Sequence, residues 1–371
     1  MSPASKPEKY VLISVNPKAG RRSPRVRAER LQTALEKRGF CVELHTDLAV
    51  VSSRANELFA ENRLQALVGV GGDGTAAELT NRTVPGVPIA ILPSGTANLI
   101  AKYLKLPFNP EKLAATIAEG ATICFDAGRA NGRLFLVMVS AGIDADVVRQ
   151  VHAAREESYR RQTKKGAHIS YLSYIKPIFG SIGSYRYPRI KTEFVDAPQN
   201  AETNAAGSTQ TSQSAATPEA ANSTQGAETA QNADIFAAST GSTREIVGKW
   251  PFVFNLPRYG WGLPLVPRCV GVDGRLDYCI FQGGKLFLAL FDVFCAQMFS
   301  SHRLLPNAKL GRGTTFRLSA ADPTAKGAAS IPYQIDGDPG GVLPVEIETV
   351  PNRFTTIAPA AVVARLERAR R

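Results

Sequence analysis

The sequence predicts a protein with two structural parts, an N-terminal parallel α/β domain and a C-terminal antiparallel β-sandwich domain. Residues 10 to about 128 alternate between apolar runs typical of strands and segments typical of helices, which is the pattern of a parallel sheet. From Arg133 onward the apolar segments are mostly short and strand-like, which favours an antiparallel domain. We therefore expect one domain over residues 1–130 and a second over residues 131–355.

The first elements follow a strand–loop–helix order. A strand is predicted over Tyr10 to Val15, and it leads into the loop Asn16-Pro17-Lys18-Ala19-Gly20. Ser23-Pro24 then has the residue types of a helix N-cap and first helical position. A second strand is expected over Val42 to Thr46, ending in a polar loop, before a helix through Ala55 to Ala60.

The stretch Gly71-Gly72-Asp73-Gly74-Thr75 lies between the apolar run Ala66 to Val70 and a helix that begins with Ala76 to Asn81. Glycines at such a turn let the backbone approach a ligand, and free N–H groups at the helix start favour phosphate. A carboxylate at Asp73 would repel phosphate unless a divalent cation lay between them, and Mg²⁺ accepts oxygens from both groups. The loop therefore indicates Mg²⁺-nucleotide binding.

Two familiar phosphate motifs are excluded here. Gly69 to Gly74 satisfies G-x-G-x-x-G formally, but no acidic residue follows about 20 positions later to hold a ribose. The P-loop is excluded because Thr75, not lysine, follows Gly74. An ordinary glycine-rich turn between a strand and a helix is the alternative interpretation of this loop alone.

A second unit of the same kind follows closely. The apolar strand Val87 to Leu92 leads into Pro93-Ser94-Gly95-Thr96-Ala97-Asn98, and a helix is expected over Leu99 to Leu104. Parallel sheets place such turns side by side at their carboxyl edge, where ligands bind. We therefore expect the two glycine loops to form one site.

The second half reads as a series of strands with one long insertion. Residues 197–243 consist mainly of small and polar residues, so a disordered insertion is predicted there. An apolar helix is expected over Lys285 to Phe299, and a terminal helix over Ala360 to Arg371 that would bring residues 356–371 back onto the first domain. The predicted strands are Leu134 to Val139, Trp250 to Leu256, Leu276 to Phe281, Thr315 to Leu318, Ile331 to Ile335 and Val345 to Glu348.

Two acidic turns stand out in this half. Asp336-Gly337-Asp338 follows the strand that ends at Ile335, and repulsion between two nearby carboxylates can raise one pKa, as a general base requires. A hairpin turn with solvated acids is the alternative interpretation. Asp273-Gly274-Arg275-Leu276-Asp277 has the composition of an ordinary β-turn.

The net charge of +12 and the pI of about 9.6 favour an anionic partner. Residues 149–191 contain ten lysines and arginines and two acids, with interleaved aromatic residues and an apolar series of helical spacing. This basic segment suits docking on an anionic membrane surface, with a solvated basic crossover as the alternative. No nucleic-acid module is recognisable, so no nucleic-acid partner is expected.

Five scattered cysteines without C-x-x-C spacing favour reduced thiols and a cytoplasmic location over a disulfide framework or zinc site. Residues 1–9 are polar and do not resemble a signal peptide. The apolar stretch Leu286 to Met298 is too short to span a bilayer. We therefore expect a cytoplasmic protein that associates peripherally with the inner face of the membrane.

In its motifs the chain resembles the diacylglycerol kinase catalytic-domain family, which includes bacterial lipid kinases and is related to sphingosine and ceramide kinases. The first glycine loop alone is shared with NAD kinases and phosphofructokinases, so the resemblance implies that type of N-terminal domain. The resemblance covers nearly the whole chain apart from the insertion. The matching residues are Val15 to Gly20, Gly71 to Thr75 with Glu78 and Asn81, Leu92 to Asn98, Ser140 to Ala145, Asp273 to Asp277 and Asp336 to Asp338.

The resemblance implies a lipid kinase that uses ATP and Mg²⁺ and phosphorylates a lipid hydroxyl, such as that of diacylglycerol, in the cleft between the domains. Glu78 is expected near the metal, or as an acid that stabilises the helix dipole. The implied catalytic residues are Asp338, Asp336 and Asp73. The implied nucleotide-binding residues are Asn16, Lys18, Thr46, Gly71, Gly72, Asp73, Gly74, Thr75, Glu78, Thr96 and Asn98.

The implied metal ligands include Asp73 for the catalytic Mg²⁺. A second, structural Mg²⁺ would take the side chain of Asp273 and carbonyl groups near Val270 and Arg275. The family usually has glutamate where this chain has Asp338, so the reach of the base is shorter by one methylene. Two rival interpretations are a catalytically weak nucleotide- or lipid-binding protein and an NAD kinase-like enzyme. Diacylglycerol, a sphingoid base, ceramide and phosphatidylglycerol all offer a suitable hydroxyl.

Overall fold

The computed structural model describes residues 8–15, 24–160, 188–195, 244–283 and 308–370. Among these residues no helix has the length and apolar character needed to cross a membrane. Several sequence predictions concern residues outside the described ranges. These are Asn16, Lys18, most of the basic segment, the insertion 197–243 and the apolar helix Lys285 to Phe299.

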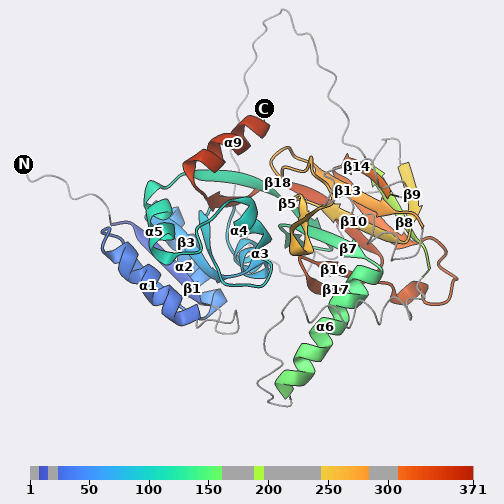
Figure 1. The fold of residues 1–371 in the computed structure, drawn as a ribbon, viewed down its shortest axis with the longest axis horizontal. Helices are drawn as coiled ribbons and strands as arrows, with labels where there is room; N and C mark the ends of the chain where they lie inside the picture. The colour runs from blue at the N-terminus through green and yellow to red at the C-terminus, as the bar shows by residue number, and fades with distance from the viewer. Residues whose placement is uncertain (1–7, 16–23, 161–187, 196–243, 284–307, 371) are drawn as a thin grey trace, which may run out of the picture.

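The N-terminal half is a parallel sheet with helices on both faces, as predicted (Figure 1). Strand β1 (Tyr10–Val15) alternates its side chains between two cores. Val11 and Ile13 face α1 (Pro24–Glu36) and α5 (Pro110–Glu119), and Leu12 faces α2 (Leu48–Ala60) and α3 (Asp73–Arg82). The four strands lie in the order β2-β1-β3-β4, with the bounds Cys41–His45, Tyr10–Val15, Leu64–Gly71 and Ile89–Pro93. The helices are α1 Pro24–Glu36, α2 Leu48–Ala60, α3 Asp73–Arg82, α4 Leu99–Tyr103 and α5 Pro110–Glu119.

Helix α2 begins earlier than the sequence prediction of Ala55 because a side chain caps it. Asp47 accepts hydrogen bonds from the amides of Ala49 and Val50 at 2.7 and 3.1 Å. Such a cap satisfies N–H groups that have no partner inside the helix. The start of this helix is therefore set one turn after β2, at the edge of the sheet where the strands end.

Strand β18 (Val345–Ile357) carries the sheet from the N-terminal domain into the C-terminal one (Figure 1). Near its end Thr356 pairs in parallel with Ile89 of β4, whereas its first residues pair antiparallel with β15. The result is a ten-stranded sheet that spans both domains. Its remaining strands are β5 Thr122–Ala130, β6 Arg133–Phe135, β8 Ile190–Val195, β9 Arg244–Gly248 and β15 Thr315–Ala320.

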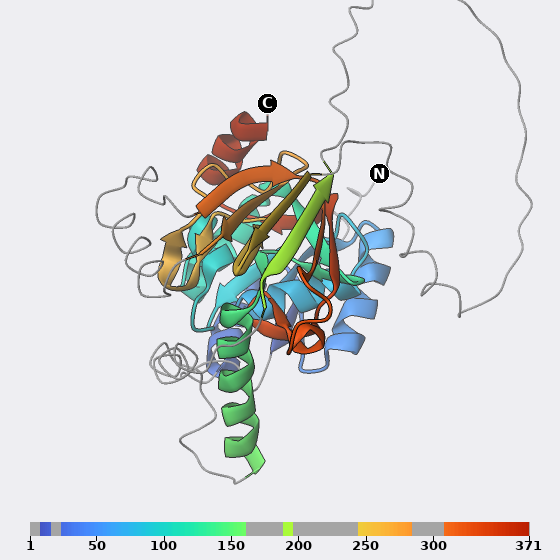
Figure 2. The same cartoon turned by 90° about the vertical axis from the view of Figure 1, so that its right-hand side faces the viewer.

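A six-stranded antiparallel sheet packs against the far half of this long sheet and completes the predicted β-sandwich (Figure 2). Aromatic side chains from the two sheets, including Phe194, Phe316 and Tyr278, share its core. The strand order is β14-β13-β10-β7-β16-β17. The bounds are Ala308–Gly313, Leu276–Phe281, Trp250–Phe254, Met138–Ala141, Pro332–Ile335 and Asp338–Val342.

Two predicted strands differ from the structure. The segment Leu134 to Val139 is not one strand but two, β6 and β7, separated by residues 136 and 137. The strand expected over Val345 to Glu348 continues to Ile357, because it pairs with β5 on both sides of an irregularity between Val350 and Phe354. The other elements are helices α6 Ile143–Arg160 and α9 Ala360–Arg370, strands β11 Arg258–Tyr259 and β12 Leu263–Pro264, and 3-10 turns at Gly260–Gly262 and Ala328–Ser330.

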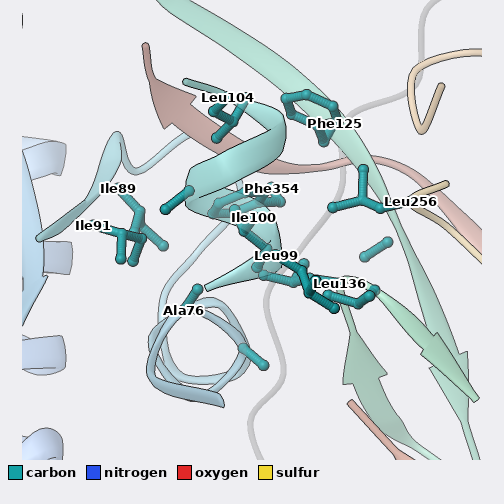
Figure 3. Close-up of a cluster of buried hydrophobic side chains, with 14 of the residues drawn as sticks. Ala76, Ile89, Ile91, Leu99, Ile100, Leu104, Phe125, Leu136, Leu256 and Phe354 are labelled. Atoms are coloured by element: carbon teal, nitrogen blue, oxygen red, sulfur yellow. The ribbon is translucent and has the colours of Figure 1, made fainter. Parts of the chain in front are cut away.

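Helix α4 is buried where the two domains meet (Figure 3). Leu99 and Ile100 lie in one core with Leu136 and Leu256 of the C-terminal domain. Helix α9 contributes Val362, Val363 and Leu366 to the same core. Burial of so many apolar side chains fixes the position of α4, and its N-terminus lies at the glycine loops described next.

Candidate active site

The two glycine loops meet backbone to backbone. A Cβ atom added to Gly95 would lie 2.7 Å from the Cα atom of Gly72, closer than real Cβ contacts allow. The amide of Ser94 donates to the carbonyl of Gly71 at 2.8 Å. The structure therefore brings the two loops together at the carboxyl edge of β3 and β4, as the sequence predicted for a parallel sheet.

Within the first loop, Gly71 is required by its neighbour Thr75. A Cβ atom at Gly71 would meet the Thr75 hydroxyl oxygen at 2.0 Å. The amides of Asp73 and Gly74 open α3, in the first turn of a helix where N–H groups lack intrahelical acceptors. This arrangement suits an anion, because the helix dipole adds a partial positive charge at the same point.

Asn98 closes the second loop on itself. Its backbone is left-handed (φ 49°), and its side chain accepts from the Gly95 amide at 3.0 Å and donates to the Gly95 carbonyl at 2.8 Å. Thr96 lies within this closed loop. The predicted nucleotide contact of Asn98 stays a prediction, and the hydrogen bonds indicate an additional role in shaping the loop.

Asp73 joins the start of α3 to the start of α4. Its two carboxylate oxygens accept hydrogen bonds from the amides of Leu99 and Ile100, both at 2.9 Å. Burial raises the pKa of Asp73, while these two amides and the charge of Lys102 lower it. A carboxylate has about four lone-pair sites, so two remain available to a cation.

Asp336 is anchored in the same way by the C-terminal domain. Its carboxylate accepts hydrogen bonds from the amides of Leu136, Val137 and Met138 at 2.8 to 2.9 Å. These amides turn away from the sheet toward the carboxylate, which explains the break between β6 and β7. Burial raises the pKa of Asp336 to about 6, opposed by the three amides and assisted by the charge of Asp73. The two acids therefore lie near enough to interact.

Asp338 faces the N-terminus of α3 from the first position of β17. One of its oxygens, Oδ2, would lie 3.8 Å from a Cβ atom added to Gly74. The same oxygen is 3.5 Å from Arg133 Nη2, and Oδ1 is 3.5 Å from His152 Nε2. With 40% of its side chain exposed, Asp338 remains accessible to a substrate. The fold thus brings the late acidic turn to the first glycine loop.

The turn that carries these acids is held from two sides. Asp336 (φ 51°) and Gly337 (φ 88°) are both left-handed, as in a two-residue hairpin of type I′. The Gly337 amide donates to Gln334 Oε1 at 2.7 Å, and the Gly337 carbonyl lies 3.1 Å from His152 Nε2. The peptide between the two acids is therefore fixed by β16 on one side and by α6 on the other.

A buried polar network supports Gln334. Its Nε2 atom donates to the Ser140 hydroxyl at 2.8 Å and to Asp144 Oδ2 at 3.1 Å. The hydroxyls of Ser140 and Tyr259 also donate to Asp144. Burial raises the pKa of Asp144, and the three hydrogen bonds oppose this effect. The network links strands β7 and β16 and helix α6 directly beneath the acidic turn.

Sequence reasoning missed Arg133 and His152. Arg133 follows an Asn-Gly pair, which signals only a hairpin turn, and His152 is one polar residue among many on α6. Each contacts Asp338, which is distant in the sequence. No local pattern marks either residue, because a contact between distant segments leaves no periodic signal in the chain.

The remaining predicted nucleotide-binding residues occupy different places. Thr46 is exposed directly after β2, at the same edge of the sheet but with β1 between it and β3. Glu78 forms ion pairs with Arg82 at 3.5 Å and Arg133 at 3.4 Å. Asn16 and Lys18 lie outside the described residues, so their roles stay predictions.

The predicted structural metal site lies in the loop before β13. Asp273 and Asp277 both pair with Arg312, at 3.1 and 3.0 Å, and each has one buried oxygen without a hydrogen-bond partner among the described residues. The Val270 carbonyl accepts from Tyr103 at 3.1 Å, and Arg275 is exposed. Orphaned carboxylate oxygens suit Mg²⁺, although Arg312 already supplies positive charge.

In the described part of the chain, no three His, Cys, Asp or Glu side chains converge to hold a metal. Mg²⁺ is usually held by one or two carboxylates together with phosphates and water. Asp73 has the free lone pairs for such a role, and its neighbour Asp336 adds negative charge.

Comparison with known proteins finds a family model that matches the N-terminal domain. Residues 10–130 match the family model of the diacylglycerol kinase catalytic domain. A diacylglycerol kinase of Staphylococcus carnosus is 27% identical over 172 residues, covering 44% of this chain and 53% of that protein. A protein of Pseudomonas aeruginosa named "Probable lipid kinase YegS-like" is 38% identical over 84 residues, or 22% of this chain and 28% of that protein. The similarity thus spans about half or less of these relatives.

The fold is also found among solved structures. The crystal structure of a diacylglycerol kinase from Bacillus anthracis str. Sterne superposes with a TM-score of 0.57 and 16% sequence identity. The superposition covers 97% of this chain and 100% of that one. At this identity the likeness concerns the fold, and it extends over both domains.

Proposed function

Residues 10–130 belong to the diacylglycerol kinase catalytic-domain family, and from this premise we propose that the chain is an ATP-dependent lipid kinase. The observation that carries the proposal is the position of Asp338. This acid reaches from the β domain to Gly74 at the N-terminus of α3, where a helix start and two glycine loops suit phosphate. A phosphate site and an accessible carboxylate in contact are what transfer to a hydroxyl requires.

In the proposed reaction the terminal phosphate of ATP lies at the loop Gly71 to Thr75. The lipid hydroxyl oxygen attacks the γ-phosphorus, and a new P–O bond forms. The bond to the bridging oxygen breaks, and its electron pair leaves with ADP. The hydroxyl proton passes to Asp338. Asp336, held by three backbone amides, fixes the turn from which Asp338 reaches the hydroxyl.

The residues present fit a metal shared with the nucleotide. Asp73, with two of its lone-pair sites engaged by α4, would hold Mg²⁺ against the phosphates. The ion would supply positive charge to the phosphate oxygens. A second Mg²⁺ at Asp273 would have a structural role in the β domain, close to the carbonyl of Val270.

We propose a lipid with a hydroxyl near an apolar tail, such as diacylglycerol, as the acceptor. It would enter between a nucleotide-binding domain over residues 1–130, with 356–371 packed against it, and a lipid-binding domain over 131–355. The basic segment would hold the protein at the anionic inner face of the membrane. These features rest on the sequence and on the family resemblance.

Radiolabelled ATP, Mg²⁺ and vesicles containing each candidate lipid test this proposal with the full chain. We expect label in one lipid, identified by mass spectrometry, and none with Asp338→Asn. A parallel reaction with NAD in place of the lipid tests the rival interpretation, an NAD kinase-like enzyme. Label in NAD and none in any lipid would replace the proposal with an NAD kinase. ATP binding without transfer to any acceptor would favour the weak binding protein.

A further inference from the structure

Strand β6 is fastened to α3, the helix that follows the first glycine loop. The side chain of Asn81 accepts from the Leu134 amide at 3.0 Å and donates to the Leu134 carbonyl at 3.1 Å. A third hydrogen bond, from the Asn81 side chain to the Ala77 carbonyl at 2.9 Å, holds this side chain in place. Arg133, the residue before Leu134, is thereby placed beside α3 although it belongs to a hairpin at the start of the β domain.

The Arg133 side chain lies between two acids from the two domains. Its Nη2 atom is 3.4 Å from Glu78 Oε1 on α3 and 3.5 Å from Asp338 Oδ2 on β17. Glu78 and Asn81 are three residues apart on the same face of α3. Asn81 therefore binds the backbone of β6, and Glu78 pairs with the guanidinium of Arg133. The arginine thus bridges the phosphate-binding helix and the acidic turn.

The guanidinium keeps donors available for a ligand. It has five N–H donors, and its contacts with Glu78 and Asp338, both in the described part of the chain, use Nη2 alone. About a third of the side chain, 36%, is exposed. Both contacts are long for charged hydrogen bonds, which are normally near 2.8 Å. A phosphate group with shorter, bidentate geometry would compete well for this side chain.

The position coincides with the place where the proposed reaction occurs. Asp338 Oδ2, the atom that Arg133 approaches, is also the atom beside Gly74. A phosphate at the α3 N-terminus and a hydroxyl at Asp338 would therefore both lie beside Arg133. Negative charge spreads over the three equatorial oxygens of that group during transfer.

We propose that Arg133 is a further catalytic residue, which leaves its ion pairs when ATP binds and donates hydrogen bonds to the γ-phosphoryl group. This inference rests on the proposed function. As the bond to ADP breaks and the bond to the lipid oxygen forms, the guanidinium stabilises the phosphoryl oxygens, while the released Asp338 accepts the hydroxyl proton. Before ATP binds, the same arginine neutralises Glu78 and Asp338 and keeps the acids in place.

The test compares the affinity of Arg133→Gln for ATP with its affinity for ADP, and Arg82→Gln is the matched control. Arg82 also pairs with Glu78, at 3.5 Å, but it makes no contact with Asp338. Titration calorimetry with Mg²⁺ should show ATP affinity reduced at least tenfold in Arg133→Gln and ADP affinity unchanged. Transfer to lipid should fall on the order of 10²- to 10³-fold, as when one preorganised donor is removed. Arg82→Gln should match the wild type in all three measurements.

Arg133→Lys keeps the charge and should recover part of the ATP preference without the bidentate geometry. Equal losses of ATP and ADP affinity in Arg133→Gln, or wild-type transfer by that variant, would overturn the proposal. The comparison of ATP and ADP affinities also tests the role of Arg133 separately from the proposed lipid kinase activity. A wild-type chain that binds ATP but phosphorylates no lipid would refute the lipid kinase, and a selective loss of ATP affinity would still assign Arg133 to the γ-phosphate.

Discussion

At the scale of single residues, the two acids of one turn have different environments and therefore different roles. Asp336 is half-buried and held by three amides, and desolvation raises its pKa to about 6. Asp338, two positions later, is 40% exposed and faces α3. The acid held by three amides is suited to fixing the turn, and the accessible one is suited to exchanging a proton with a substrate.

We expect Asp338→Asn to abolish phosphoryl transfer and to leave ATP affinity within a few-fold of the wild type, because the glycine loops lie in the other domain. Stability should change by less than about 1 kcal/mol, since the ion pairs of Asp338 are partly exposed. Asp338→Glu restores the acid of the family and should retain transfer. A loss of ATP binding in Asp338→Asn would instead assign the acid to the nucleotide site.

Asp336 should make stability depend on pH in a defined direction. Because folding raises its pKa from 3.8 to about 6, its contribution to stability is fully present below about pH 4 and is lost as pH rises through about 6. The stability of the wild type relative to Asp336→Asn should therefore fall by roughly 2–3 kcal/mol between pH 4 and pH 7, at about 1.4 kcal/mol per pKa unit. Urea unfolding of both proteins across this range measures the difference, and parallel pH profiles would contradict the assignment.

At the scale of elements, the site depends on close approach between backbones. The loop after β3 and the loop after β4 cross at Gly72 and Gly95. The acidic turn is held by hydrogen bonds with β16 and α6. In both places backbone groups lie so close to their partners that a changed side chain would move them apart. Substitutions at these points should therefore affect nucleotide binding and transfer separately.

Gly95→Ala should weaken ATP binding at least tenfold and lower stability by about 1–3 kcal/mol, because the new Cβ would lie 2.7 Å from the Gly72 Cα atom and must push the loops apart. Gly283→Ala is the matched control, since no atom of the described residues lies within 4 Å of its added Cβ. Thermal unfolding and calorimetry on both variants check the prediction. Wild-type ATP affinity in Gly95→Ala would show that the loops part without consequence.

Gln334→Leu should lower the rate of transfer with little change in ATP affinity. The substitution leaves the Gly337 amide without its acceptor and removes one of the three donors to the Asp144 carboxyl, so the turn between the two acids loses its support from β16. Loss of these buried hydrogen bonds should also lower stability by about 1–3 kcal/mol. The transfer rate and the ATP affinity, measured on the same preparation, show which of the two properties the substitution changes. A tenfold loss of ATP affinity would refute a role confined to the turn.

At the scale of the whole molecule, the two domains share one sheet and one core. Strand β18 pairs with β4 of the first domain and β15 of the second, and helices α4 and α9 pack in a core that includes Leu136 and Leu256 (Figure 3). The site therefore lies between parts that are joined by continuous backbone hydrogen bonding. Figure 1 shows β18 running from one half of the molecule to the other.

A fragment of residues 1–130 should consequently fail to fold by itself. It lacks β18 and α9, which contribute Phe354, Val362 and Leu366 to the core that also contains Leu104 and Phe125. Circular dichroism and amide proton dispersion should indicate an unfolded chain, whereas the full chain should show cooperative unfolding. A stably folded fragment would show that the shared sheet is dispensable to the first domain.

The sequence by itself determined the local units of this protein. Apolar runs of strand length, each followed by glycine and a helix, predicted β3 with α3 and β4 with α4, and the parallel pattern predicted that the two glycine loops lie side by side. These features depend on neighbouring residues, whose periodicity and backbone freedom are visible in the chain. The acidic turn was also recognisable, because Asp-Gly pairs favour left-handed hairpin turns.

Only the tertiary structure decided which of these units meet across the domains. It placed Asp338 beside Gly74, directed three amides of one broken strand at Asp336, and set Arg133 between Glu78 and Asp338. It also extended β18 from Glu348, where the predicted strand ended, to Ile357. Such contacts arise from the burial of a shared core and the pairing of distant strands, and their energies depend on partners that no local pattern specifies.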